Sequence, residues 1–188
     1  MKEQVRKLLA LREKIYIEDS NFKRAAVLIP LFKKNGWQIL FTKRSEEVPF
    51  HKGEISFPGG SFEKEKDESL LDTALRETFE EIGVPPEEFE ILGELDDFKT
   101  ITNFTVTPFV AHMNYPQNFS LNVKEIQELI IVPLKHLLDE RNSYLKEITF
   151  QGKKYKVYFF NYKNKVIWGA TGRILKGFLD LIRMDWSK

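Results

Sequence analysis

The sequence predicts an α+β fold in which helices sandwich a mixed β-sheet. Many strand-like apolar runs alternate with a few helix-like segments along the chain. The 188 residues, of which 42% are hydrophobic, are enough to bury a core without disulfides. We find no internal repeat and no linker-like segment, so we expect one domain spanning residues 1–188.

The first elements are an N-terminal helix and a hairpin. Apolar residues at roughly helical spacing indicate a helix over 2–16, within an N-terminal extension of residues 1–20. A β-branched, apolar run over 24–32 and the run 37–41 flank Asn35-Gly36. Because Asn-Gly favours positive φ at both turn positions, these runs predict a tight hairpin.

A helix over 69–82 is the element with the strongest boundary signals. Ser69 is followed three residues later by Asp72, a capping-box arrangement, and Gly83 ends the helix. The other elements that we expect are a loop over 45–53, a short strand over 55–57, strands over about 89–97, 102–113, 125–132, 144–150 and 154–161, a short helix over 133–140, and a closing helix over 170–184.

Composition excludes several functional classes. The absence of cysteine excludes a disulfide scaffold, a zinc-thiolate site and a cysteine nucleophile. A net charge of +1 gives no reason to expect nucleic acid or a charged membrane as a partner. The apolar run 25–32 is far shorter than a membrane helix, and the N-terminus has no signal-peptide core. We therefore expect a cytoplasmic protein without nucleic-acid or membrane partners, either monomeric or homodimeric.

The segment from Gly59 to Val84 contains the residues that indicate chemistry. On a helix, Glu77, Glu80 and Glu81 lie within one turn, where three carboxylates repel one another unless a cation lies among them. Oxygen ligands without His or Cys suit Mg²⁺ or Mn²⁺. Gly59-Gly60 would let backbone carbonyls approach a metal or a phosphate. A solvated acidic helix face is the alternative for the glutamates taken alone.

Residues 76–84, Arg-Glu-Thr-Phe-Glu-Glu-Ile-Gly-Val, resemble the R-E-U-x-E-E-x-G-U core of the Nudix box, in which U is aliphatic. Thr78 departs from this pattern, and the spacing from Gly60 to Arg76 is two residues longer than the family's general spacing. The resemblance places a Nudix box at about 60–84. It implies a Nudix-like α/β/α sandwich and metal-dependent hydrolysis of a diphosphate.

The chain further resembles the coenzyme A diphosphatase branch of this family, which also lengthens this loop. The similar segments are 40–45, 51–60, 73–78, 105–109, 125–128, 132–134 and 167–171. This resemblance implies cleavage of coenzyme A or its derivatives to 4′-phosphopantetheine and adenosine 3′,5′-bisphosphate. One alternative is a Nudix diphosphatase acting on ADP-ribose, NADH or another nucleoside diphosphate derivative. Another is a non-catalytic Nudix-fold binding module, against which the three intact glutamates argue.

The resemblance also implies residue roles. Glu77 and Glu81 would be the principal metal ligands, and Glu80 a further ligand or the catalytic base. Arg76 would orient a glutamate, and Gly60 would offer a backbone carbonyl to the metal.

Outside the box, Glu125 and Glu128 are both candidates for a distal catalytic acid. His51 is expected to be a hydrogen-bonded loop residue. The residues expected to contact the substrate are Lys43, Arg44, Lys52 and Gly59. The residues expected in the core, rather than in a base-stacking surface, are Phe57, Leu75, Phe79, Val106 and Trp168.

Charge is unevenly distributed along the chain. Residues 61–90 contain eleven acidic and three basic residues, a net charge of −8, which leaves +9 on the rest of the chain. The near-neutral total therefore combines an acidic, metal-binding segment with a basic remainder that suits a phosphorylated substrate.

Overall fold

A computed structural model describes residues 1–47, 52–115 and 117–186; His51 and part of the expected 45–53 loop lie outside them. The helices are α1 (Lys2–Leu11), α2 (Leu70–Ile82), α3 (Leu134–Leu138) and α4 (Gly169–Trp186), with 3₁₀ turns at Pro86–Glu88 and Glu140–Asn142. The strands are β1 (Lys23–Lys33), β2 (Trp37–Arg44), β3 (Ile55–Ser56), β4 (Gly59–Ser61), β5 (Phe89–Glu94), β6 (Phe98–Lys99), β7 (Phe104–Met113), β8 (Ile126–Pro133), β9 (Ser143–Phe150), β10 (Lys153–Tyr162) and β11 (Lys165–Ile167).

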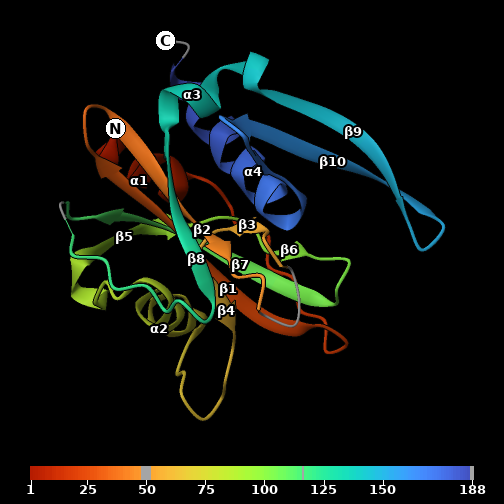
Figure 1. The fold of residues 1–188 in the computed structure, drawn as a ribbon, viewed down its shortest axis with the longest axis horizontal. Coiled ribbons are helices and arrows are strands. Elements are labelled where there is room, and N and C mark those ends of the chain that lie inside the picture. Colours follow the sequence, from red (N-terminus) through yellow and green to blue (C-terminus); the bar gives the residue numbers. More distant parts are fainter. Residues whose placement is uncertain (48–51, 116, 187–188) are drawn as a thin grey trace.

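A mixed eight-stranded sheet forms the centre of the fold (Figure 1). Its main path runs in the order β3-β2-β1-β7-β5, and β8 pairs with β2. β1 and β7 are parallel over nine residue pairs, whereas the other pairings of this sheet are antiparallel. The prediction of an α+β fold with a mixed sheet is confirmed.

The β3–β4 segment lies between β1 and β2 and brings the Gly-Gly loop into the sheet. Ser56 of β3 pairs with Thr42 of β2, and Gly60 of β4 pairs with Ala26 of β1. At Gly59, φ is +147°, and a Cβ atom would lie 2.3 Å from the carbonyl oxygen of Ala26. Because no side chain fits there, Gly59 allows the two strands to meet.

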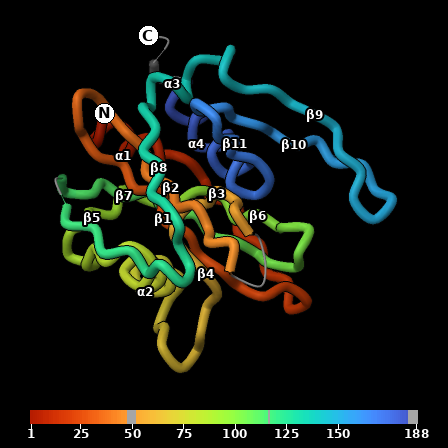
Figure 2. The backbone as a smooth tube through the Cα atoms, in the orientation of Figure 1, coloured from red at the N-terminus to blue at the C-terminus, as the bar shows by residue number. Residues whose placement is uncertain are grey.

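Helices cover both faces of the sheet. On one face, α2 buries Ala74 and Ile82 against a cluster that includes Leu28 of β1. On the other, α1 and α4 bury a second cluster that includes Phe41 and Phe178. Figures 1 and 2 show α2 and α4 on opposite sides of the sheet. This three-layer arrangement agrees with the expected α/β/α sandwich.

A second sheet, with the order β11-β10-β9, extends away from the main body (Figure 2). Its strands β9 and β10 match the strands expected over 144–150 and 154–161, but their separation from the main sheet was not predicted. Phe160 and Ile167 face each other across β10 and β11 and are buried in the same core cluster as α4 residues. The opposite face of this sheet is therefore turned away from α4.

Some sequence-based expectations were wrong. The N-terminal helix ends at Leu11 rather than at 16, because Arg12 is extended and binds Asp96 at 2.6 Å.

Two of the residues expected in the core are partly exposed. Phe79 and Trp168 are 50% and 39% exposed rather than in the core. The strands β4, β6 and β11 were not predicted. Of the other expected core residues, Phe57 and Val106 are buried and Leu75 is half-buried.

Candidate active site

The candidate site is built on α2, whose ends match the sequence signals. The Ser69 hydroxyl accepts the Asp72 N–H at 3.2 Å, and Gly83 ends the helix with φ +71°. Thr78 is buried, and its hydroxyl donates to the Ala74 carbonyl at 2.6 Å. Because that bond satisfies the hydroxyl, threonine can stand where the family pattern has an aliphatic residue.

Arg76 is held by a residue that the sequence analysis missed. The Arg76 guanidinium binds both carboxylate oxygens of Asp67, at 2.7 and 3.0 Å. Asp67 also accepts the Glu63 N–H and the Thr73 hydroxyl, each at 2.9 Å. The Arg76 bonds lower the pKa of this buried carboxyl to about 2. In the sequence, Asp67 is one of several acidic residues before α2, and nothing distinguishes it from its neighbours.

Arg76 in turn connects two of the box carboxylates. Its Nη1 atom donates to Glu77 Oε1 at 2.8 Å and to Glu80 Oε1 at 3.3 Å. Asp67, Glu77 and Glu80 surround the guanidinium and raise the pKa of Arg76. The orienting role expected for Arg76 thus has a direct structural counterpart, although its function stays a prediction.

Glu77 lies directly against Gly60. A Cβ atom on Gly60 would lie 2.3 Å from the carboxyl carbon of Glu77. Gly60 therefore leaves the space that the Glu77 carboxylate occupies. Burial raises the pKa of Glu77, and the nearby charges of Glu80 and Glu125 raise it further, whereas Arg76 lowers it.

Glu81 is the buried carboxylate of the site. It is 2% exposed and accepts a hydrogen bond from the Thr42 hydroxyl at 3.4 Å. Burial raises its pKa to about 8, the charge of Arg44 lowers it, and those of Glu77 and Glu125 raise it. Glu80, in contrast, has a side chain that is 49% exposed. The three glutamates therefore occupy different depths rather than one solvated helix face.

The two distal acids are placed differently. Glu128 lies opposite Lys43 in the β2–β8 register, and its carboxylate binds Lys165 at 2.8 Å. Ile130, two residues further along β8, belongs to the core cluster on the α4 side, so Glu128 projects from the face opposite α2. Glu125 instead acts electrostatically on Glu77 and Glu81. The structure thus brings Glu125, and not Glu128, to the box carboxylates.

The expected substrate-binding residues are also divided. The positive charge of Arg44 lowers the pKa of Glu81. The Nε atom of Arg44 is buried without a hydrogen-bond partner in the part of the chain that the structure describes. Lys43 lies opposite Glu128 in the strand register, and its side chain is on the other face of β2 from that of Arg44. Lys52 is exposed at the border of the described residues, and Gly59 packs against β1.

Within the described ranges, no three His, Cys, Asp or Glu side chains are arranged to hold a metal ion. Arg76 instead occupies oxygens of both Glu77 and Glu80. Binding of a cation by these glutamates would therefore require their side chains to shift.

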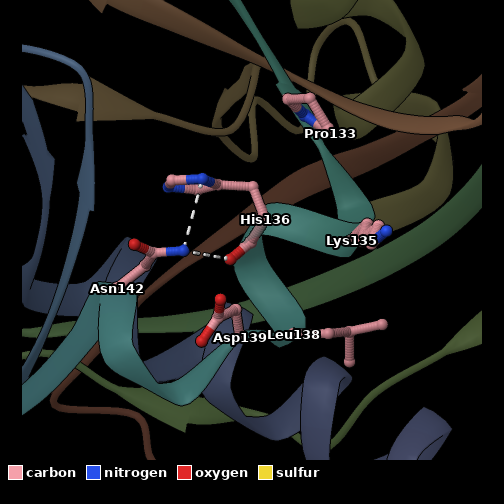
Figure 3. A pocket seen from close by; sticks show the side chains of 6 residues that line it. All are labelled: Pro133, Lys135, His136, Leu138, Asp139 and Asn142. Atoms are coloured by element: carbon pink, nitrogen blue, oxygen red, sulfur yellow. Dashed lines mark hydrogen bonds between the residues drawn. The ribbon is translucent and has the colours of Figure 1, made fainter.

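A hollow in the surface lies away from these residues, at α3 (Figure 3). There, the Asn142 side chain donates to the His136 carbonyl at 3.0 Å, and the His136 ring contacts the Asn161 carbonyl at 2.7 Å. None of the box residues lines this hollow, so it is not the candidate active site. Among the described residues, no helix has both the length and the apolar character needed to cross a membrane.

Comparisons with known proteins agree with this geometry. A family model described as NUDIX domain matches residues 22–151. The uncharacterized Nudix hydrolase NudL of Pectobacterium atrosepticum is 34% identical over 153 residues, which cover 81% of this chain and 79% of that protein. The corresponding protein of Photorhabdus laumondii is 33% identical over 159 residues, covering 85% and 84%.

Solved structures show the same fold. A C. elegans Ap4A hydrolase complex aligns with a TM-score of 0.51 at 24% identity, covering 59% of this chain and 80% of that one. A MutT/nudix family protein from Enterococcus faecalis aligns with a TM-score of 0.54 at 16% identity, covering 95% and 67%. With the family match and the relatives, the chain belongs to the Nudix hydrolases, which cleave the diphosphate of nucleoside diphosphate derivatives.

Proposed function

We propose that this Nudix hydrolase cleaves coenzyme A or its derivatives to 4′-phosphopantetheine and adenosine 3′,5′-bisphosphate. The observation that carries the proposal is that the charge of Arg44, whose buried Nε lacks a partner among the described residues, reaches Glu81, a buried carboxylate. A buried acid suits a cation, and a guanidinium with an unpartnered N–H suits a phosphate oxygen. The resemblance of segments 40–45 and 51–60 to the coenzyme A branch supports the choice of substrate.

The donor chemistry of these residues fits a hard divalent cation, Mg²⁺ or Mn²⁺, and Glu77 and Glu80 would turn from Arg76 to bind it. Their donors are oxygens only, and Gly60 leaves room for the Glu77 carboxylate. Burying Glu81 in its charged form is unfavourable without a compensating positive charge. The groups that would hold the cation are the carboxylates of Glu77, Glu80 and Glu81 and the carbonyl of Gly60. When bound, such an ion neutralises phosphate charge and lowers the pKa of a water molecule.

The remaining roles follow from the contacts. Asp67 holds Arg76, which positions Glu77 and Glu80. Glu80 is the most exposed box carboxylate and is suited to accept the proton of the attacking water. The water oxygen bonds to one phosphorus while the bridging P–O bond breaks, and the second phosphate leaves. Arg44 contacts the diphosphate.

A substrate panel with Mg²⁺ or Mn²⁺ tests the proposal. Coenzyme A, dephospho-coenzyme A, ADP-ribose and NADH are incubated separately, and the products are separated by chromatography. We expect coenzyme A to be cut fastest and dephospho-coenzyme A more slowly, because basic residues such as Lys52 would contact the missing 3′-phosphate. Intact coenzyme A beside hydrolysed ADP-ribose or NADH would contradict the choice of substrate.

The role of Arg44 is tested by Arg44→Gln. Loss of a charge-assisted hydrogen bond to phosphate should raise KM for coenzyme A by about 10-fold or more. Lys33→Gln is the matched control, because it removes one positive charge where β1 pairs with the start of β2, at the end opposite Arg44. An equal rise in KM for both variants would show that only net charge matters.

A further inference from the structure

Three aromatic rings form a row across the second sheet. The Trp168 and Phe159 rings are stacked with centroids 6.0 Å apart, and the Phe159 and Tyr144 rings with centroids 5.0 Å apart. Both pairs are parallel to within 3°. We call Trp168, Phe159 and Tyr144 the aromatic row. Trp168 and Tyr144, at its two ends, are 39% and 46% exposed.

Strand register explains why these rings lie together. Phe159 faces Tyr144 across β10 and β9, and Phe160 faces Ile167 across β10 and β11. Trp168 follows Ile167 directly, which places it beside Phe159. Because Phe160 and Ile167 are buried in the core shared with α4, the aromatic row occupies the opposite, outer face of the sheet.

The Trp168 end of the row adjoins the strands of the candidate active site. β11 contacts β3. In β3, Ser56 pairs with Thr42, whose hydroxyl donates to Glu81. Phe159 stacks on one face of the Trp168 indole. Trp168 directly follows β11, the edge strand of its sheet, and is 39% exposed.

We propose that Trp168 is the stacking surface for the adenine ring of the substrate. The proposal rests on the proposed function, because it assumes an adenine nucleotide whose diphosphate lies at the Glu77 and Glu81 carboxylates. In such a substrate a ribose separates the base from the diphosphate, so the base must bind beside the carboxylates rather than among them. An exposed indole offers the π face that adenine requires, and the ring behind it holds the indole in one orientation.

Binding alone can test this proposal without catalysis. Tryptophan fluorescence is measured while adenosine 3′,5′-bisphosphate, or 4′-phosphopantetheine as a ligand without a base, is added. The chain has three tryptophans, so Trp168→Phe is compared with Trp37→Phe, which removes a tryptophan of β2 at the end remote from Arg44. We expect saturable quenching by the bisphosphate in the unchanged protein and in Trp37→Phe, loss of that quenching in Trp168→Phe, and none with 4′-phosphopantetheine.

Kinetics give a second readout. Trp168→Ala should raise KM for an adenine-containing substrate by about 10-fold or more, because a base–aromatic stack is lost, while kcat changes little. Trp168→Phe should restore most of the affinity. Phe159→Leu, which leaves the indole without its backing ring, should give a smaller rise in KM. Thermal melts establish that each variant is folded.

Quenching that persists in Trp168→Phe would overturn the proposal, and so would an unchanged KM in a folded Trp168→Ala protein. A lowered melting temperature without either binding effect would show that the row only stabilises the sheet, which also overturns it. Failure of the proposed function is distinguishable. If ADP-ribose rather than coenzyme A is cut, Trp168 should still govern KM for that adenine nucleotide. If neither is cut, the quenching experiment decides alone.

Discussion

Glu81 shows most clearly how the fold changes the chemistry of a single residue. Its carboxyl group has an ordinary pKa of 4.5, which burial raises to about 8. Arg44, Glu77 and Glu125 are the charged groups that act on it. A group whose pKa is raised by folding contributes stability below its unfolded pKa, and that contribution is lost as the pH rises through the folded value.

The metal-free protein should therefore lose stability between pH 4.5 and about 8. The loss should reach a few kcal/mol, since each unit of pKa shift corresponds to about 1.4 kcal/mol. Melting temperatures measured across this range in a chelator check the prediction. Glu81→Gln should flatten the pH dependence, and Mg²⁺ should restore stability to the unchanged protein at the higher pH. A variant with the same pH profile as the unchanged protein would contradict it.

Gly60 provides a second test at the residue scale. Gly60→Ala places a methyl group where the Glu77 carboxylate lies, so the carboxylate must move. Because a displacement of about 1 Å in a catalytic group can reduce the rate about 100-fold, we expect a loss of that order in kcat/KM. Gly177→Ala is the matched control, since a Cβ atom there meets nothing within 4 Å. Equal losses in both variants would exclude crowding of Glu77 as the cause.

The sequence predicted which residues share the helix turn of the site, but it did not predict how deeply each one is buried. The spacing of Glu77, Glu80 and Glu81 placed them on one helix turn, which the structure confirms. The sequence did not indicate that Glu81 is buried while Glu80 is exposed, because depth depends on Thr42 and its neighbours from a distant strand. Phe79 was assigned to the core for the same reason, since its apolar character alone does not reveal that its position on α2 is exposed.

At the scale of elements, the longer loop before α2 is attached to the helix through Asp67. This side chain is fully buried and bonds Arg76, Thr73 and the backbone of Glu63. The two additional residues relative to the general Nudix spacing therefore do not leave the loop detached from the box. The loop supplies the aspartate that binds Arg76, which in turn donates to Glu77 and Glu80.

Asp67→Asn should both destabilise the protein and lower its hydrolytic activity. Removing one partner of a buried ion pair costs about 3 kcal/mol, and released positioning of catalytic carboxylates lowers activity about 10- to 100-fold. Urea unfolding and steady-state kinetics measure the two effects. Glu68→Gln, a change at the exposed neighbouring acid, should alter neither. An Asp67→Asn protein with full activity would show that Arg76 needs no such support.

Element prediction worked where a segment carried its own signal. The hairpin at Asn35-Gly36 and the caps of α2 use local turn and capping chemistry, and both are present. β4, β6 and β11 have two or three residues each, too few to show a period, and their partner strands specify them. The N-terminal helix ended early because Arg12 and Lys14 bind Asp96 and Glu94, contacts that no local pattern reveals.

At the scale of the whole molecule, residues that the sequence predicted to lie in one site are found on opposite faces of the sheet. The charge of Arg44 lowers the pKa of Glu81 on the α2 face of the sheet, whereas Lys43 and Glu128 lie on the opposite face. The sequence placed Lys43 and Arg44 together because they are adjacent. Successive side chains of a strand point to opposite faces of the sheet, so these two neighbours in sequence lie on different faces.

The separation of charge along the chain predicts a dependence on salt. Residues 61–90 carry −8 and the remainder +9, so a polyanionic substrate is attracted to the basic part of the molecule. Raising ionic strength from about 0.05 to about 0.5 M should raise KM for coenzyme A several-fold with little change in kcat, because screening weakens long-range attraction. Steady-state kinetics over a salt series check this. A salt-independent KM would indicate that the attraction is short-range.

The central claim is that diphosphate cleavage occurs at the carboxylates of α2. The most direct test compares Glu81→Gln with Glu128→Gln on the substrate panel in saturating Mn²⁺. Because the buried ligand supplies several kcal/mol of stabilisation, Glu81→Gln should lose at least about 100-fold in kcat. Glu128→Gln should stay within a few-fold of the unchanged protein. Full activity of Glu81→Gln, or a comparable loss in Glu128→Gln, would contradict the claim.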